Sequence, residues 1–220
     1  QANSRVASLQ KQLIEAKLEW LNTAQTLSLK RKAAAISLSE TVSQLMAELG
    51  MTGGLFEVQL SLNDNDEPHS HGLERCEFLV SANPGQPVKA LRKVASGGEL
   101  ARISLAIEVA TLGLDPTPTM VFDEVDSGIG GAIAEVVGQK LRALGKQCQV
   151  LCVTHLAQVA SLGHQHYLVA KRSEQNSTQS YVIALENESR IEEIARMMGG
   201  IALSSQSLDH AEAMLNHGQM

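Results

Sequence analysis

Aromatic residues are scarce in this chain of 220 residues, since phenylalanine, tryptophan and tyrosine together make up only 3% of it. This leaves little material for stacking nucleic-acid bases or for an aromatic ligand cage. Net positive charge is lacking too, because the formal net charge is −6 at pH 7. Any DNA contact would therefore rest on a local patch such as Lys89, Arg92 and Lys93, for which the plain alternative is a solvated loop face.

Cysteine and long hydrophobic runs are also limited. The three cysteines, an odd number without disulfide spacing, fit a reducing cytoplasm. No apolar run is long enough to span a bilayer and no signal peptide is present, so we expect no membrane partner. With 220 residues the chain can bury one good core, or one core plus an extension, and its 44% of hydrophobic residues predicts that most of it is globular. The chain begins with Gln1 inside a helical pattern, and we expect it to be a fragment of a longer polypeptide.

Residues 1–49 form the first of two expected domains, a coiled-coil helix. Apolar or small side chains recur there three and four residues apart, which is the pattern of a coiled-coil seam. Such a helix is roughly 70 Å long, and its narrow stripe needs a partner strand from a missing part of the polypeptide or from a second copy. The alternative is a helix lying on its own globular domain. The seam comprises Val6, Leu9, Leu13, Ala16, Trp20, Thr23 and Leu27, and resumes at Leu38, Val42, Leu45 and Leu49.

Residues 50–220 form the second expected domain, and it opens with a β-hairpin. Alternating apolar residues predict one strand from Phe56 to Leu62 and a second from Arg75 to Ala82. The loop between them is rich in acidic residues and histidine, which could ligate a metal, although such crowding in a turn is more typical of a solvated hairpin. The loop residues concerned are Asp64, Asp66, Glu67, His69 and His71.

A polar glycine turn then runs into an apolar helical stretch. Ser96 and Glu99 have the spacing of a capping box, which predicts that a helix begins here. Gly97 and Gly98 would let another body approach the free backbone amides, whose partial positive charge attracts anions such as phosphate. The alternative is an ordinary capped helix that follows a loop.

Two apolar runs downstream each end in polar residues. Residues 119–122 precede Asp123 and Glu124, and residues 149–154 precede His155, with a helix expected from about 133 to 144 between them. A strand, a helix and a second strand form a right-handed crossover, which makes the strands parallel. The two carboxylates and the imidazole should therefore meet at one edge of the sheet, where α/β proteins bind ligands.

These side chains are the parts of an ATP hydrolysis site. Asp123 could hold Mg²⁺ through water, Glu124 could orient or deprotonate the attacking water, and His155 could donate a hydrogen bond to the γ-phosphate. The phosphate loop G-x-x-x-x-G-K-[ST] is absent from the sequence. The remaining residues predict a hairpin over 167–185 and two amphipathic helices, over 190–198 and 207–216, to which we assign no chemistry.

Three segments in this order and spacing, within residues 88–172, resemble the C-terminal half of the RecN family of bacterial DNA repair proteins, in the SMC-like branch of the ABC ATPases. They are A-S-G-G-E-L-A-R-I-S-L-A, T-M-V-F-D-E-V-D-S-G-I-G-G and V-L-C-V-T-H-L-A-Q-V-A. The resemblance implies an α/β fold: the C-terminal lobe of an ABC/SMC-type ATPase head, with parallel strands and a β-hairpin, preceded by a long coiled-coil helix. It also implies that Ser96 to Glu99 is the ABC signature, that Asp123 and Glu124 are the Walker B pair, and that His155 is the switch histidine.

The resemblance further implies ATP and Mg²⁺ as cofactors, bound between two heads, in a cytoplasmic, nucleoid-associated protein of DNA double-strand break repair and recombination. Its partners would be its own N-terminal half, a second copy and DNA, and this chain alone would be inactive. The chain departs from the family pattern at two places: Ala95 stands in place of leucine, and residues 127–130 stand where many ABC proteins have the D-loop aspartate. Whether Asp126 takes the role of that aspartate is left open. The alternatives are the head of another SMC or RecF-like ATPase, or a catalytically silent dimerisation module.

Overall fold

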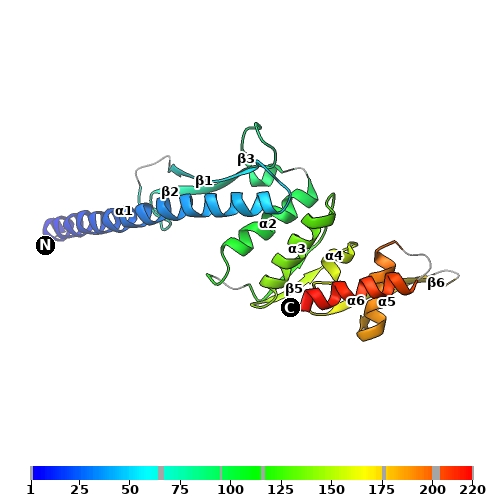
Figure 1. Ribbon diagram of the computed structural model, residues 1–220. Helices are drawn as coiled ribbons and strands as arrows, with labels where there is room; N and C mark the ends of the chain where they lie inside the picture. The colour runs from blue at the N-terminus through cyan, green and yellow to red at the C-terminus, as the bar shows by residue number, and fades with distance from the viewer. Residues whose placement is uncertain are drawn as a thin grey trace. The chain divides into compact units, whose positions relative to one another are not determined.

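The computed structural model describes residues 2–63, 67–94, 96–114, 117–174, 177–199 and 204–219 (Figure 1). Contacts divide the chain into two compact units, one of residues 1–44 with 53–94 and the other of residues 45–52 with 95–220. The expected division into a coiled-coil arm of residues 1–49 and a lobe of residues 50–220 stays a prediction. Within the described residues, no helix combines the length and the apolar character needed to cross a membrane.

The first unit combines a long helix with a β-hairpin. Helix α1 spans Ala2–Glu48, and strands β1 (Leu55–Leu62) and β2 (Glu74–Ser81) pair antiparallel, as the alternating pattern predicts. The basic loop after the hairpin has more structure than expected. It forms the short strand β3 (Lys89–Ala90), which pairs with β2, and a 3-10 turn, η1 (Leu91–Lys93).

The middle of α1 lies along the hairpin (Figure 1). The Trp20 indole N–H donates to the His69 carbonyl at 2.9 Å, and the Arg31 guanidinium donates to the His71 carbonyl at 2.7 Å. The expectation that the whole helix needs an outside partner is therefore wrong for this part, because the hairpin of the same chain supplies the contacts. Apolar side chains near the N-terminus of α1 remain exposed. They are those of Val6, Leu9, Leu13, Ile14 and Leu18.

The second unit contains the expected crossover. Helix α2 spans Gly97–Ala110, strand β4 Thr119–Phe122, helix α3 Gly131–Leu144 and strand β5 Gln149–Cys152. Strands β4 and β5 are parallel, with Phe122 opposite Cys152, so the predicted topology is confirmed. Strand β5 ends two residues earlier than the apolar run suggested.

The remaining elements are helix α4 (Ala157–Ala160), strands β6 (His166–Glu174) and β7 (Ser177–Leu185), and helices α5 (Asn187–Met197) and α6 (Ser205–Gln219). Strands β6 and β7 form the expected hairpin, longer than predicted, and α4 was not predicted. Helices α4, α5 and α6 share a small core. Its buried residues are Ala157, Ala160, Ile194, Ala195, Ala211 and Leu215.

Candidate functional site

The N-terminus of α2 begins where the capping pattern places it. Ser96 is the N-cap residue, and its hydroxyl accepts from the Glu99 backbone N–H at 3.3 Å. This bond satisfies one of the free amides of the first turn. Ala95, the expected departure from the signature pattern, lies outside the described residues. Gly97 is exposed and Gly98 is buried, so the two glycines have different surroundings.

Each of these glycines is approached by a residue that follows β4. A Cβ at Gly98 would lie 3.0 Å from the Ser127 Cβ and 3.1 Å from the Ser127 carbonyl oxygen. A Cβ at Gly97 would lie 2.5 Å from Oε2 of Glu124. The Glu124 carboxylate therefore occupies the space beside the positive end of α2, where a helix attracts anions.

Asp123 and Glu124 are both exposed at the carboxyl end of β4. Glu124 has a φ of 57°, in the left-handed region, which costs a non-glycine residue about 1 kcal/mol. The turn that holds it is closed by the Ser127 N–H, which donates to the Glu124 carbonyl at 3.0 Å. Backbone strain of this kind persists where the surrounding structure enforces it.

His155 follows β5 at the same edge and contacts Asp126. Its Nδ1 lies 3.3 Å from Asp126 Oδ2, and its backbone N–H donates to the same oxygen at 3.1 Å. The imidazole side chain is 69% exposed, whereas the carboxylate is 2% exposed. Asp123, Glu124 and His155 thus lie at one edge of the sheet, as the crossover predicts. The buried carboxylate of Asp126 lies beside His155.

Arg102 is a part of this region that the sequence did not single out. From α2 its guanidinium donates to the Ser127 carbonyl at 2.8 Å and to the Val125 carbonyl at 3.4 Å, and burial lowers its pKa. The sequence signal that could have found it is an arginine directly before the apolar stretch of the helix, three residues after the Ser96 to Glu99 turn. The segment after β4 is therefore held by α2 on one side, and on the other Asp126 contacts Thr154 and His155, which follow β5.

The described residues contain no group of three or more histidine, cysteine or acidic side chains arranged to hold a metal ion. Asp64 and Asp66, which the sequence offered as ligands, lie outside the described residues.

Cys152, next to the candidate site, is not an activated thiol. Burial raises its pKa to about 12, and the nearby charges of Asp126 and Asp123 add to the effect.

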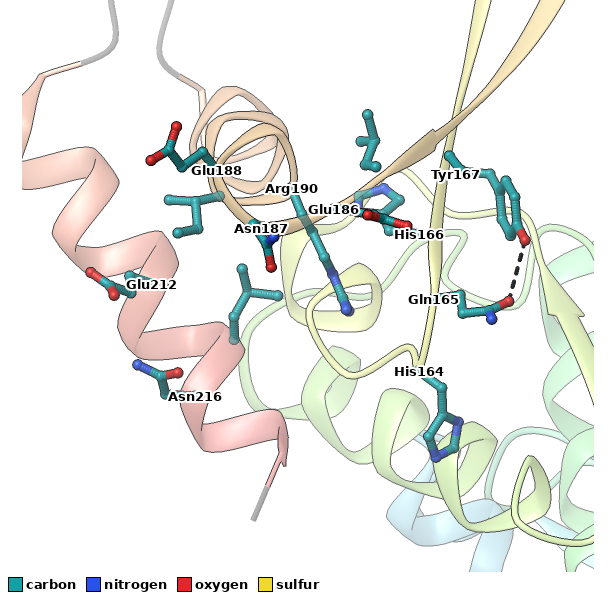
Figure 2. A pocket seen from close by; sticks show the side chains of 14 residues that line it. His164, Gln165, His166, Tyr167, Glu186, Asn187, Glu188, Arg190, Glu212 and Asn216 are labelled. Atoms are coloured by element: carbon teal, nitrogen blue, oxygen red, sulfur yellow. Dashed lines mark hydrogen bonds between the residues drawn. The ribbon is translucent and has the colours of Figure 1, made fainter.

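A pocket of about 540 Å³ opens elsewhere in the second unit, between the base of the β6–β7 hairpin and helices α5 and α6 (Figure 2). None of the predicted site residues lines it. Figure 2 shows Arg190 reaching into it from α5, and its guanidinium donates to the Gly163 carbonyl at 2.6 Å and to those of Ala160 and Ser161. Arg190 thus satisfies carbonyls at the end of α4, which is a structural role.

Comparison with known proteins finds relatives described as DNA repair protein RecN. That of Xylella fastidiosa is 56% identical over 205 residues, covering 93% of this chain and 36% of its own length. That of Vibrio cholerae is 45% identical over 87% of this chain and 34% of its own length. That of Deinococcus radiodurans is 43% identical over 94% of this chain and 36% of its own length. The chain thus spans about a third of the length of these relatives. No family model matches the chain.

Two solved structures share the fold. The Smc head domain with a coiled coil and joint from Pyrococcus yayanosii aligns with a TM-score of 0.59 at 20% identity, over 89% of this chain and 35% of that one. The Smc head domain with an extended coiled coil from Pyrococcus furiosus, bound to the C-terminal domain of ScpA, aligns with a TM-score of 0.54 at 22% identity, over 88% and 45%. The fold is therefore that of the C-terminal lobe of an SMC-type head, preceded by a long helix.

Proposed function

Because this chain corresponds to the C-terminal part of the RecN family of DNA repair proteins, we propose that it supplies three parts of a composite ATP site between two heads. These parts are the signature turn at Ser96 to Glu99, the acid pair Asp123 and Glu124, and His155. The observation that carries the proposal is the meeting of the acid pair and the imidazole at the end of parallel strands, beside the exposed N-terminus of α2.

The chemistry of each side chain suits its proposed role. The exposed Asp123 carboxylate is a hard oxygen donor that would hold Mg²⁺ through water, and the ion when bound neutralises phosphate charge. Glu124 orients or deprotonates the water that attacks the γ-phosphate in line. His155, whose ring is exposed, donates a hydrogen bond to the same phosphate.

The signature turn acts on ATP held by the other head. The exposed Gly97 leaves backbone amides at the start of α2 open to a γ-phosphate, while Ser96 keeps the helix capped. In the single chain the Glu124 carboxylate lies beside Gly97. A second anion entering this space would repel that carboxylate, so engagement of two heads would move Glu124 away from α2 toward the water it activates.

The remainder of the polypeptide would complete the site. It would provide the phosphate loop and a partner for the bare part of α1. Exposed apolar residues on the short parallel sheet support this, since Val121 is 66% exposed and Leu151 is 47% exposed. Closing and opening of the heads, driven by ATP binding and hydrolysis, would be coupled to holding DNA during double-strand break repair.

The test is Glu124→Gln in the complete protein. We expect at least a hundredfold loss of ATP turnover, on the order that a general base contributes, together with accumulation of closed dimers when ATP is present. ATPase assays and size-exclusion chromatography with and without ATP measure the two effects. Glu108→Gln is the matched control and should behave as wild type. It is the same substitution, at a residue in the later part of α2. Undiminished turnover by Glu124→Gln contradicts the role of Glu124, and a wild-type protein without turnover favours a silent dimerisation module.

A further inference from the structure

We propose that Asp126 is a positioning residue, which holds the ring of His155 with its proton on Nδ1 and leaves Nε2 free to face the phosphate. The inference deepens the proposed function and rests on it for the identity of the group that Nε2 meets. The arrangement of the ring itself follows from the contacts of Asp126 and can be measured separately.

Two hydrogen bonds and one ion-pair contact converge on one oxygen of Asp126. The hydroxyl of Thr154, the backbone N–H of His155 and the Nδ1 of His155 all lie within reach of Oδ2, the last two at 3.1 and 3.3 Å. A carboxylate can only accept hydrogen bonds, so this contact favours a proton on the ring nitrogen beside it. The contact therefore selects one tautomer of the neutral ring.

The carboxylate is held in place from both sides. It is 2% exposed, and its neighbours Val125 and Ser127 are the two residues whose carbonyls accept from Arg102. The Thr154 hydroxyl, which donates to Asp126, also accepts from the Leu156 N–H at 3.1 Å. Asp126 is thus fixed by α2 on one side, while its bonds fix residues 154–156 on the other.

This placement decides what the exposed end of the ring can do. With Nδ1 beside Asp126, Nε2 is the ring nitrogen left to face a ligand. Nε2 donates to a phosphate oxygen when it too carries a proton, and the ring then has one N–H toward each anion. Without the carboxylate, the ring can rotate or change tautomer and loses this preorganisation.

The kinetic test uses Asp126→Asn, His155→Ala and the double variant in the complete protein. The amide oxygen introduced by Asp126→Asn can still accept from Thr154 and from the backbone, but the neutral amide has no charge to offer the ring. We expect kcat to fall about tenfold or more for Asp126→Asn, with little change in KM for ATP. In the His155→Ala background the same change should cost nothing further, because its effect passes through the ring. Asp209→Asn, an exposed change on α6, is the control.

The spectroscopic test is independent of turnover. Nitrogen NMR of the complete protein labelled with ¹⁵N-histidine, with the signal assigned by its loss in His155→Gln, should show a protonated Nδ1 in the wild type and a changed tautomer in Asp126→Ala, which removes the acceptor. A wild-type ring protonated on Nε2 alone, or additive losses in the double variant, overturns the inference. The expected tautomer in a protein that hydrolyses no ATP supports the role of Asp126 and refutes the proposed function instead.

Discussion

At the scale of the residue, the adjacent Gly97 and Gly98 differ in burial and in what packs against them. Gly98 is buried against the Ser127 backbone, so the absence of its side chain lets α2 approach the turn after β4. Gly97 is exposed, and only the flexible end of Glu124 lies close to it. The sequence pattern treated both as openings for phosphate, whereas of the two only Gly97 is exposed.

The two glycine-to-alanine variants should therefore differ in the complete protein. Gly98→Ala places a Cβ 3.1 Å from the carbonyl oxygen of Ser127, and we expect it to lower the free energy of unfolding by about 1–3 kcal/mol. In Gly97→Ala the Glu124 carboxylate can rotate away, so stability should change by less than about 0.5 kcal/mol, while ATP turnover falls. Urea unfolding and ATPase assays separate the effects. Equal destabilisation by the two changes would contradict this assignment.

At the scale of the element, α1 protects the open edge of β1. Ser43 Oγ accepts from the Phe56 N–H at 2.9 Å, and Ser39 Oγ accepts from the Val58 N–H at 3.0 Å. An unpaired strand edge is otherwise a template for pairing with another chain. The two serines on α1 thus accept hydrogen bonds from β1 that the carbonyls of a neighbouring strand accept in most sheets.

Removing these hydroxyls should loosen the hairpin. We expect Ser39→Ala and Ser43→Ala each to lower the free energy of unfolding by about 1–2 kcal/mol, because each leaves a backbone N–H of β1 without its acceptor. Thr41→Ala is the matched control, since its hydroxyl is exposed and donates only within α1, to the Ser37 carbonyl. Chemical denaturation of the three variants measures the difference. A loss in Thr41→Ala as large as in the serine variants would show that the helix, not the hairpin contact, is responsible.

At the scale of the whole molecule, two apolar surfaces are left open. One is the N-terminal part of α1, where Leu9 and Leu13 are each 56% exposed, and the other lies on the β4–β5 sheet, where Leu151 is 47% exposed. Apolar area of this kind marks an interaction surface. Since the chain spans about a third of its relatives' length, the remaining polypeptide is the proposed occupant of both surfaces.

This chain by itself should hydrolyse essentially no ATP, and mixing it with the preceding part of its polypeptide should restore turnover. Leu9→Lys with Leu13→Lys should weaken that association at least about tenfold, because burying an unpaired charge is costly. Ser8→Lys with Gln12→Lys adds the same two charges outside the seam and is the control. Analytical ultracentrifugation and ATPase assays measure binding and turnover. Robust hydrolysis by the isolated chain would refute the idea that it is half of a site.

Local patterns were sufficient for much of this architecture. The Ser96 cap, the alternation in β1 and β2, and the crossover between β4 and β5 each depend on residues close in sequence, and the structure has all of them. Because the two strands of a crossover run parallel, the edge at which the acid pair meets His155 was also predictable. Helix α4 was missed because its four residues are too few to show a helical period.

What only the tertiary structure decided depends on contacts between residues far apart in the chain. The hairpin covers α1 through bonds such as that from Trp20 to His69, 49 residues apart, which no local pattern encodes. Likewise Asp126 reaches His155 across 29 residues, and Arg102 reaches Ser127 across 25. Residue type and spacing determine which elements form and which polar groups end a strand. Packing determines which of those groups are buried, because burial depends on every element that comes to lie beside them.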